Sequence, residues 1–183
     1  DLKVRITGGR AKGLPLRVPK GDTVRPTTDR VRQALFNVLT HRFERPFDDA
    51  RTLDLFAGAG SLGLEALSHG AQQAVFVEAN AKVATVLRQN AAKVGLSHRV
   101  VQSTVSRFLA GPSTPFDLVF MDPPYAKADV APILAQLMTG GWLAEEAVIC
   151  VETGAPEDAP EVNGLDLAFV RTYGNTTISI YCL

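Results

Sequence analysis

From residue 51 onward, the chain alternates between short apolar runs and amphipathic segments, and this pattern restricts the possible folds more than any other feature. Short apolar runs between turn residues predict buried strands, whereas apolar residues spaced three and four apart predict helices. The pattern predicts strands over 52–56, 74–77, 100–102, 116–121 and 147–151, and helices from Ser61 onward and over 81–94, 106–109 and 129–138. Such alternation is typical of a parallel sheet with helices on both faces.

The last two apolar runs, 165–173 and 176–182, are separated only by Gly174 and Asn175. A two-residue connection can join only antiparallel strands, so we expect a hairpin there. The predicted fold is therefore an α/β, doubly wound, mostly parallel sheet of seven strands that ends in an antiparallel hairpin. That ending is unusual for nucleotide-binding dehydrogenases, and it resembles the architecture of the Rossmann-like methyltransferases.

The N-terminal segment differs from the remainder in charge. Residues 1–45 contain eleven Lys or Arg and four Asp or Glu, a net charge of +7, whereas residues 46–183 contain eight and fifteen, a net charge of −7. We therefore divide the chain into a basic appendage (1–45) and a main domain (46–183). A basic segment on an acidic body favours contact with a polyanion, although a solvated basic surface remains an alternative. The candidate residues for contact with a polyanion are Arg10, Lys12, Arg17, Lys20, Arg25, Arg30 and Arg32, and the alternative for Arg25 and Arg32 is to close over the cofactor or orient the base.

The local sequence pattern of the appendage predicts its secondary structure. Residues 1–20 alternate and contain glycines, which predicts a short hairpin or arm that could not bury itself alone. A helix is expected to begin at residues 27–29, because Pro26 cannot lie inside a helix and Thr or Asp can cap one. Its predicted apolar face places Arg30 and Arg32 outside that face, and residues 41–50 are expected to form a linker.

Composition excludes some classes of protein. No apolar run approaches the ~20 residues of a membrane-spanning helix, so no membrane association is expected. Cys150 and Cys182 have neither metal-ligand spacing nor the pattern of a disulfide framework. We expect both to be reduced, buried residues of a cytoplasmic protein, with no metal site.

A glycine-rich loop follows the first predicted strand of the main domain. Gly58, Gly60 and Gly63 satisfy G-x-G-x-x-G, and Glu78 lies twenty residues after Gly58, where a carboxylate can accept hydrogen bonds from ribose hydroxyls. A dinucleotide fits this loop, but so does S-adenosylmethionine, which also carries adenosine. The ammonium of the latter needs an acceptor, for which Asp54 is suited. The alternative is that Asp54 caps the turn.

A second loop, Asp122-Pro123-Pro124-Tyr125, follows the fourth predicted strand. Parallel strands direct their carboxyl ends to the same edge, so this loop is expected to face the glycine loop. Two prolines remove two N–H donors and leave acceptors, which can orient an aromatic amine and stabilise the charge that develops as it is methylated. Tyr125 offers a face for stacking a splayed base. The alternative is a rigid turn with a buried tyrosine.

With these motifs the chain resembles the bacterial methyltransferases that modify N2 of a guanine in small-subunit ribosomal RNA. The resemblance covers nearly the whole chain, and its most specific parts are the arm and the Arg-Pro-Thr helix start. The matching segments are 5–9, 25–32, 35–37, 53–63, 63–67 and 122–125.

The resemblance implies S-adenosylmethionine as cofactor and ribosomal RNA, or a small-subunit assembly particle, as partner, with the basic arm holding RNA. We expect the protein to be a monomer. It implies that the target amine is held by Asp122, Pro123, Pro124 and Tyr125. The implied cofactor-binding residues are Asp54, Phe56, Ala57, Gly58, Gly60, Glu78, Ala79, Thr104 and Val105. The segment 102–105 lacks the acidic residue that many methyltransferases place near adenine, so backbone groups of Thr104 and Val105 are expected to recognise it.

Other functions remain open at this point. Methylation of DNA adenine or of a protein glutamine uses the same amine chemistry, although the chain leaves little room for a long target-recognition insertion. An NAD-dependent dehydrogenase would explain the glycine loop but not residues 122–125 or the hairpin. A non-catalytic RNA-binding module would explain only the arm.

Overall fold

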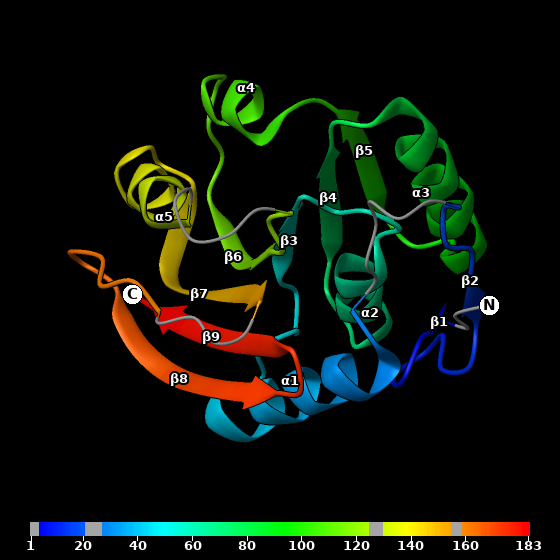
Figure 1. Cartoon of the computed structure of the whole chain (residues 1–183), viewed down its shortest axis with the longest axis horizontal. Helices are drawn as coiled ribbons and strands as arrows, with labels where there is room; N and C mark the ends of the chain where they lie inside the picture. The colour runs from blue at the N-terminus through cyan, green and yellow to red at the C-terminus, as the bar shows by residue number, and fades with distance from the viewer. Residues whose placement is uncertain (1–3, 21–26, 125–129, 155–158) are drawn as a thin grey trace.

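The computed structural model describes residues 4–20, 27–124, 130–154 and 159–183. Its main sheet has the strand order β5-β4-β3-β6-β7-β9-β8 (Figure 1). The first five of these strands in that order pair in parallel, whereas β9 pairs antiparallel with both β7 and β8. The predicted mostly parallel sheet with a terminal hairpin is therefore confirmed. The strands are β3 (Arg51–Leu55), β4 (Gln73–Glu78), β5 (His98–Gln102), β6 (Phe116–Met121), β7 (Leu143–Gly154), β8 (Asp166–Tyr173) and β9 (Thr176–Cys182).

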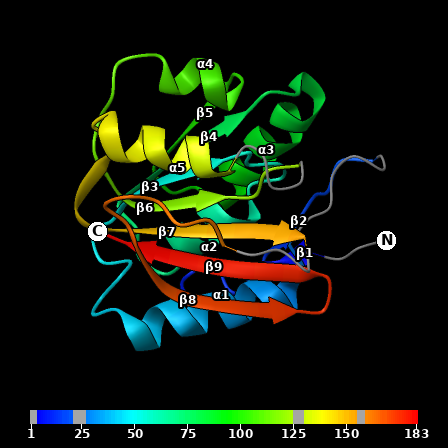
Figure 2. The ribbon, with the colours of Figure 1, turned by 60° about the vertical axis from the view of Figure 1, so that its left-hand side comes forward.

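Helices cover both faces of the sheet, as the alternating pattern predicted (Figure 2). One core cluster joins α1 (Asp29–Arg42), α2 (Ser61–Ser68) and α3 (Ala81–Val94) to the face that carries Phe76 and Phe120. The other joins α4 (Val105–Leu109) and α5 (Val130–Thr139) to the opposite face, which carries Val77 and Met121. Successive strand residues point to opposite faces, so each parallel strand contributes to both clusters.

The N-terminal arm packs against the main domain and contributes to its core. Its strands β1 (Val4–Arg5) and β2 (Pro15–Leu16) form a separate antiparallel pair. Val4, Ile6 and Leu16 are buried in the same cluster as α1, α2 and α3. The arm, which could not bury itself alone, thus obtains its apolar contacts from the helices beside it (Figure 1).

Two local expectations need correction. The segment 41–50 is not a free linker: α1 continues to Arg42, and the ring of Phe47 stacks on Phe36 with centroids 5.1 Å apart. Of the two cysteines, Cys150 is buried but Cys182 is only half-buried at the end of β9, and both are free thiols. Among the described residues, no helix is both long enough and apolar enough to cross a bilayer.

Candidate active site

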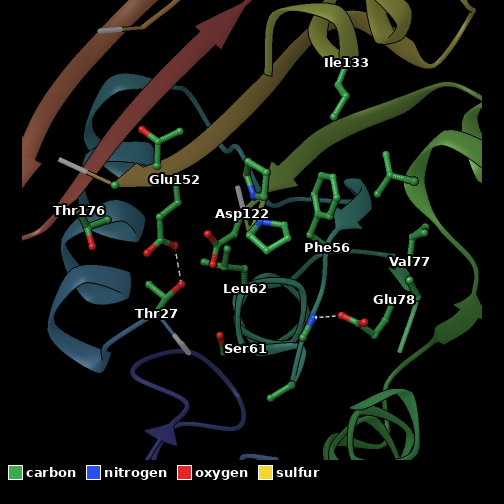
Figure 3. A pocket seen from close by; sticks show the side chains of 18 of the residues that line it. Thr27, Phe56, Ser61, Leu62, Val77, Glu78, Asp122, Ile133, Glu152 and Thr176 are labelled. Carbon is green, nitrogen blue, oxygen red and sulfur yellow. Dashed lines mark hydrogen bonds between the residues drawn. The ribbon is translucent and has the colours of Figure 1, made fainter. Parts of the chain in front are cut away.

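A cavity of about 1450 Å³ lies at the carboxyl ends of the parallel strands. Phe56 follows β3, Glu78 ends β4, Asp122 follows β6 and Glu152 lies near the end of β7, and all four line the cavity (Figure 3). Strand order reverses at β3, with β4 and β5 on one side and β6 and β7 on the other, and open α/β sheets bind ligands at such a point. The volume exceeds the ~300–1000 Å³ of common ligand pockets, which leaves room for two groups side by side.

Glu78 is held rigidly on one side of the cavity. Its Oε1 accepts a hydrogen bond from the backbone N–H of Gly58 at 2.9 Å, and its Oε2 accepts one from Asn80 at 2.8 Å (Figure 3). Each carboxylate oxygen retains a lone pair after these bonds. Glu78 is therefore a fixed acceptor for paired hydroxyl groups, and Gly58 and Ala79 line the cavity beside it.

Phe56 lies on the cavity wall in a strained conformation. Its φ of 57° places a bulky residue in the left-handed region, which costs about 1–3 kcal/mol and persists only where the surroundings impose it. Thr104 and Val105, expected to lie near an adenine, also line the cavity. The Thr104 side chain accepts from the backbone N–H of Arg107 and so begins α4.

The remaining predicted cofactor residues, Asp54, Ala57 and Gly60, are not on the cavity wall. The side chain of Asp54 is buried, and its Oδ2 accepts from the N–H of Gly63 at 3.0 Å, so Asp54 caps α2, whose N-cap residue Gly60 has no side chain to do so. Burial raises the pKa of Asp54 well above its usual value, the Gly63 bond opposes this, and the charges of Glu78 and Glu152 reinforce it. The geometry matches the capping alternative considered for Asp54 and gives no support for its direct contact with a cofactor.

Asp122, Pro123 and Pro124 form the opposite part of the wall, where the sequence predicted them. Asp122 follows directly after the buried strand β6. Burial raises the pKa of the Asp122 carboxyl well above its usual value, and the nearby charges of Glu152 and Asp54 raise it further. Tyr125 lies outside the described residues, so its expected stacking role stays a prediction.

Glu152 is a site residue that the sequence analysis missed. Because Met121 pairs with Val151 in the parallel β6–β7 register, the next residues, Asp122 and Glu152, lie side by side at the strand ends. The buried hydroxyl of Thr27 donates to Glu152 Oε2 at 2.5 Å (Figure 3). Burial raises the pKa of Glu152, whereas the Thr27 bond and the charge of Arg32 lower it. The available signal was an acidic residue following an apolar strand, as at Asp122.

The predicted RNA-binding cations fall into three groups. Arg10, Lys12, Arg17, Lys20 and Arg30 are exposed, and Arg30 also lines the cavity. Arg25 lies outside the described residues. Arg32 was expected on the surface, and that prediction is wrong, because the side chain is fully buried. Its Nε donates to Glu65 Oε1 at 3.0 Å, and its other nitrogens donate to the Thr27 and Arg5 carbonyls and to Asp29.

The motif 5–9 of the arm is bound to this same buried pair. Glu65 on α2 accepts from the backbone and hydroxyl of Thr7 at 2.8 and 2.9 Å and from the N–H of Gly8 at 3.1 Å. Gly9 has a φ of 78°, and a Cβ there would lie 2.1 Å from the Ser68 carbonyl oxygen, so only glycine allows this approach. The arm motif and the 63–67 segment are thus joined by buried contacts. Sequence patterns missed Glu65 because an isolated glutamate on a helix predicts a solvated position.

Comparison with known proteins agrees with this architecture. The family model described as Conserved hypothetical protein 95 matches residues 4–182. Ribosomal RNA small subunit methyltransferase D of Escherichia coli is 42% identical over 161 residues, which are 87% of this chain and 79% of that protein. The putative rRNA methyltransferase YlbH of Bacillus subtilis is 35% identical over 97% of this chain and 98% of its own length.

A solved structure is similar over nearly the whole of both chains. The putative methyltransferase yhhF from Escherichia coli superposes with a TM-score of 0.86 at 40% identity, covering 98% of this chain and 97% of that one. The family match therefore extends to the arm, to both sides of the cavity and to the terminal hairpin. The chain belongs to the Conserved hypothetical protein 95 family, and ribosomal RNA small subunit methyltransferase D is among its relatives.

Proposed function

We propose that the protein transfers a methyl group from S-adenosylmethionine to the exocyclic N2 amine of a guanine in small-subunit ribosomal RNA. The observation that carries this proposal is that Asp122 and its two prolines share one cavity with the Glu78–Gly58 pair. One side offers fixed acceptors for an adenosine ribose, and the other offers acceptors for an amine. The relatives named as ribosomal RNA methyltransferases support the choice of substrate.

The residues around Glu78 fit S-adenosylmethionine. Glu78 is the acceptor for the ribose hydroxyls, held in place by Gly58 and Asn80. Thr104 and Val105 border the space for the adenine, and Phe56 lies on the wall of the same cavity. When bound, S-adenosylmethionine supplies an electrophilic methyl group on a sulfonium.

Asp122 and the Pro123 carbonyl act on the substrate amine. An amine on an aromatic ring is a weak nucleophile because its lone pair is delocalised, and two acceptors on its N–H bonds favour the pyramidal nitrogen that can attack. As the N–CH₃ bond forms in place of the bond between the sulfonium and that methyl group, one N–H bond must also break. Asp122 accepts this proton, and the raised pKa of its carboxyl makes it a stronger base than an exposed aspartate.

The exposed cations of the arm and Arg30 provide the contacts to RNA phosphates. Such contacts position a nucleic acid and carry little sequence information. Arg30 differs from the cations of the arm because it also lies on the cavity wall. We place the reaction in the cytoplasm, in keeping with two free cysteines.

Two substitutions separate cofactor binding from chemistry. Glu78→Ala removes the ribose acceptor, and we expect S-adenosylhomocysteine to bind weaker by about 1–3 kcal/mol in titration calorimetry. Asp122→Ala should keep that affinity within about twofold and lose methyl transfer by at least about 100-fold, since Asp122 acts on the amine. The assay incubates unmodified small-subunit RNA, or particles, with labelled cofactor and digests the product to nucleosides. A methylated adenine in place of N2-methylguanosine, or wild-type turnover by Asp122→Ala, would overturn the proposal.

A further inference from the structure

We propose that Glu152 determines the base specificity of the site by accepting a hydrogen bond from N1–H of the target guanine on its Oε1, while Asp122 and the Pro123 carbonyl hold the neighbouring N2 amine. This inference rests on the proposed function and deepens it. It assigns the recognition of the ring, as distinct from the methylation of the amine, to a residue on β7.

The first argument is position. Asp122 and Glu152 follow paired residues, Met121 and Val151, on adjacent parallel strands, and neighbouring strands lie about 4.8 Å apart. Both side chains line the same cavity (Figure 3). N1–H and the N2 amine are adjacent donors on the Watson–Crick edge of guanine. Two carboxylates one strand spacing apart can therefore accept from these two donors at the same time.

The second argument is orientation. The Thr27 hydroxyl donates to Oε2 of Glu152 at 2.5 Å, which fixes the carboxylate, and no residue that the structure describes donates a hydrogen bond to its Oε1. Thr27 is itself held, because its carbonyl accepts from the buried Arg32 guanidinium at 3.0 Å. Glu152 is therefore held in place by a chain of contacts that begins in the core, and it is not a mobile surface side chain.

The third argument is charge. Burial raises the pKa of Glu152, whereas the Thr27 bond and the Arg32 charge lower it and so act against the loss of its ionised form. An ionised carboxylate is acceptor-only. It suits guanine, whose N1 carries a proton, and it repels adenine, whose N1 presents a lone pair. The same group that binds the correct base therefore rejects the other purine.

The experiment compares guanosine with 2,6-diaminopurine, which keeps the 2-amine but has no proton on N1. The guanosine that the wild type methylates is mapped first, and the smallest transcript that is methylated there is then synthesised with either base at that position. We expect the wild type to prefer guanosine by about 10- to 100-fold in kcat/KM, the scale of one base-edge contact. In Glu152→Gln the amide can donate to N1, so this preference should fall by about 10-fold or more.

The two bases also differ at position 6, where guanine carries an oxygen and 2,6-diaminopurine carries an amine. This difference affects the wild type and Glu152→Gln alike, so it cancels when their preferences are compared. Glu145→Gln, an exposed residue on the same strand, is the matched control and should keep the wild-type preference. Glu152→Asp retains an acceptor and should also keep it, at lower kcat/KM. S-adenosylhomocysteine affinity, measured for every variant, shows that the cofactor side is intact.

Two results would overturn the inference while leaving the proposed function intact. One is equal methylation of the two bases by wild type, which needs no variant to fold. The other is a Glu152→Gln preference equal to that of wild type. Absence of N2-methylguanosine from every wild-type product would instead contradict the proposed function, and the two failures are thereby distinguished.

Discussion

At the scale of single residues, Asp122 and Glu152 place two ionisable carboxyl groups at one buried wall, and burial raises the pKa of both. A carboxyl whose folded pKa is raised stabilises the protein below its unfolded pKa and loses that contribution as pH rises through the folded value. At neutral pH we therefore expect Asp122→Asn to raise the melting temperature, by about 2–4 °C for each kcal/mol relieved. The gain should shrink as pH falls toward 4, as differential scanning calorimetry at several pH values would show. Asp166→Asn, at an exposed position on β8, should change nothing, and a lower melting temperature for Asp122→Asn would contradict this account.

At the scale of elements, the buried Arg32–Glu65 pair joins α1, α2 and the arm. Removing one partner of a buried pair leaves an uncompensated charge, which costs about 3–5 kcal/mol. We expect Arg32→Ala to lower the free energy of unfolding by this amount in urea titration. Arg30→Ala, two residues away and exposed, is the matched control and should change stability by less than about 0.5 kcal/mol. Equal stability of the two variants would show that the pair does not hold the arm in solution.

At the scale of the whole molecule, charge is segregated between a basic N-terminal segment and an acidic main domain. Each phosphate neutralised on a single strand contributes about −0.7 to the slope of log affinity against log salt. We expect the double variant Arg10→Ala/Lys12→Ala to bind small-subunit RNA with a slope shallower by about 1.4, measured by fluorescence anisotropy. The double variant Arg99→Ala/Arg107→Ala removes two exposed cations outside the predicted set and should retain the wild-type slope. Identical salt-dependence slopes for both double variants would show that the basic segment is a solvated surface that does not bind RNA.

The sequence by itself determined the order and type of the elements. Strand 116–121, helix 81–94 and strand 176–182 were predicted with the bounds that the structure shows, because apolar periodicity and turn residues act over a few positions. The two-residue connection at Gly174 also required a hairpin, whatever the remaining chain did. Since parallel strands direct their carboxyl ends to one edge, these local facts were enough to bring Glu78 and Asp122 to the same cavity.

Only the tertiary structure decided which polar residues are buried and what they contact. Arg32 looked like a surface cation because its own neighbours along α1 cannot reveal that Glu65, thirty-three positions away, lies opposite it. Glu152 lies beside Asp122 only through the β6–β7 register, and Asp54 caps α2, whose N-cap residue Gly60 has no side chain to do so. Each of these outcomes depends on partners distant in sequence, and burying a charge is tolerated only where such a partner is present. A one-dimensional pattern contains the candidate residues, but the pairing that gives them a role is a property of the packed core.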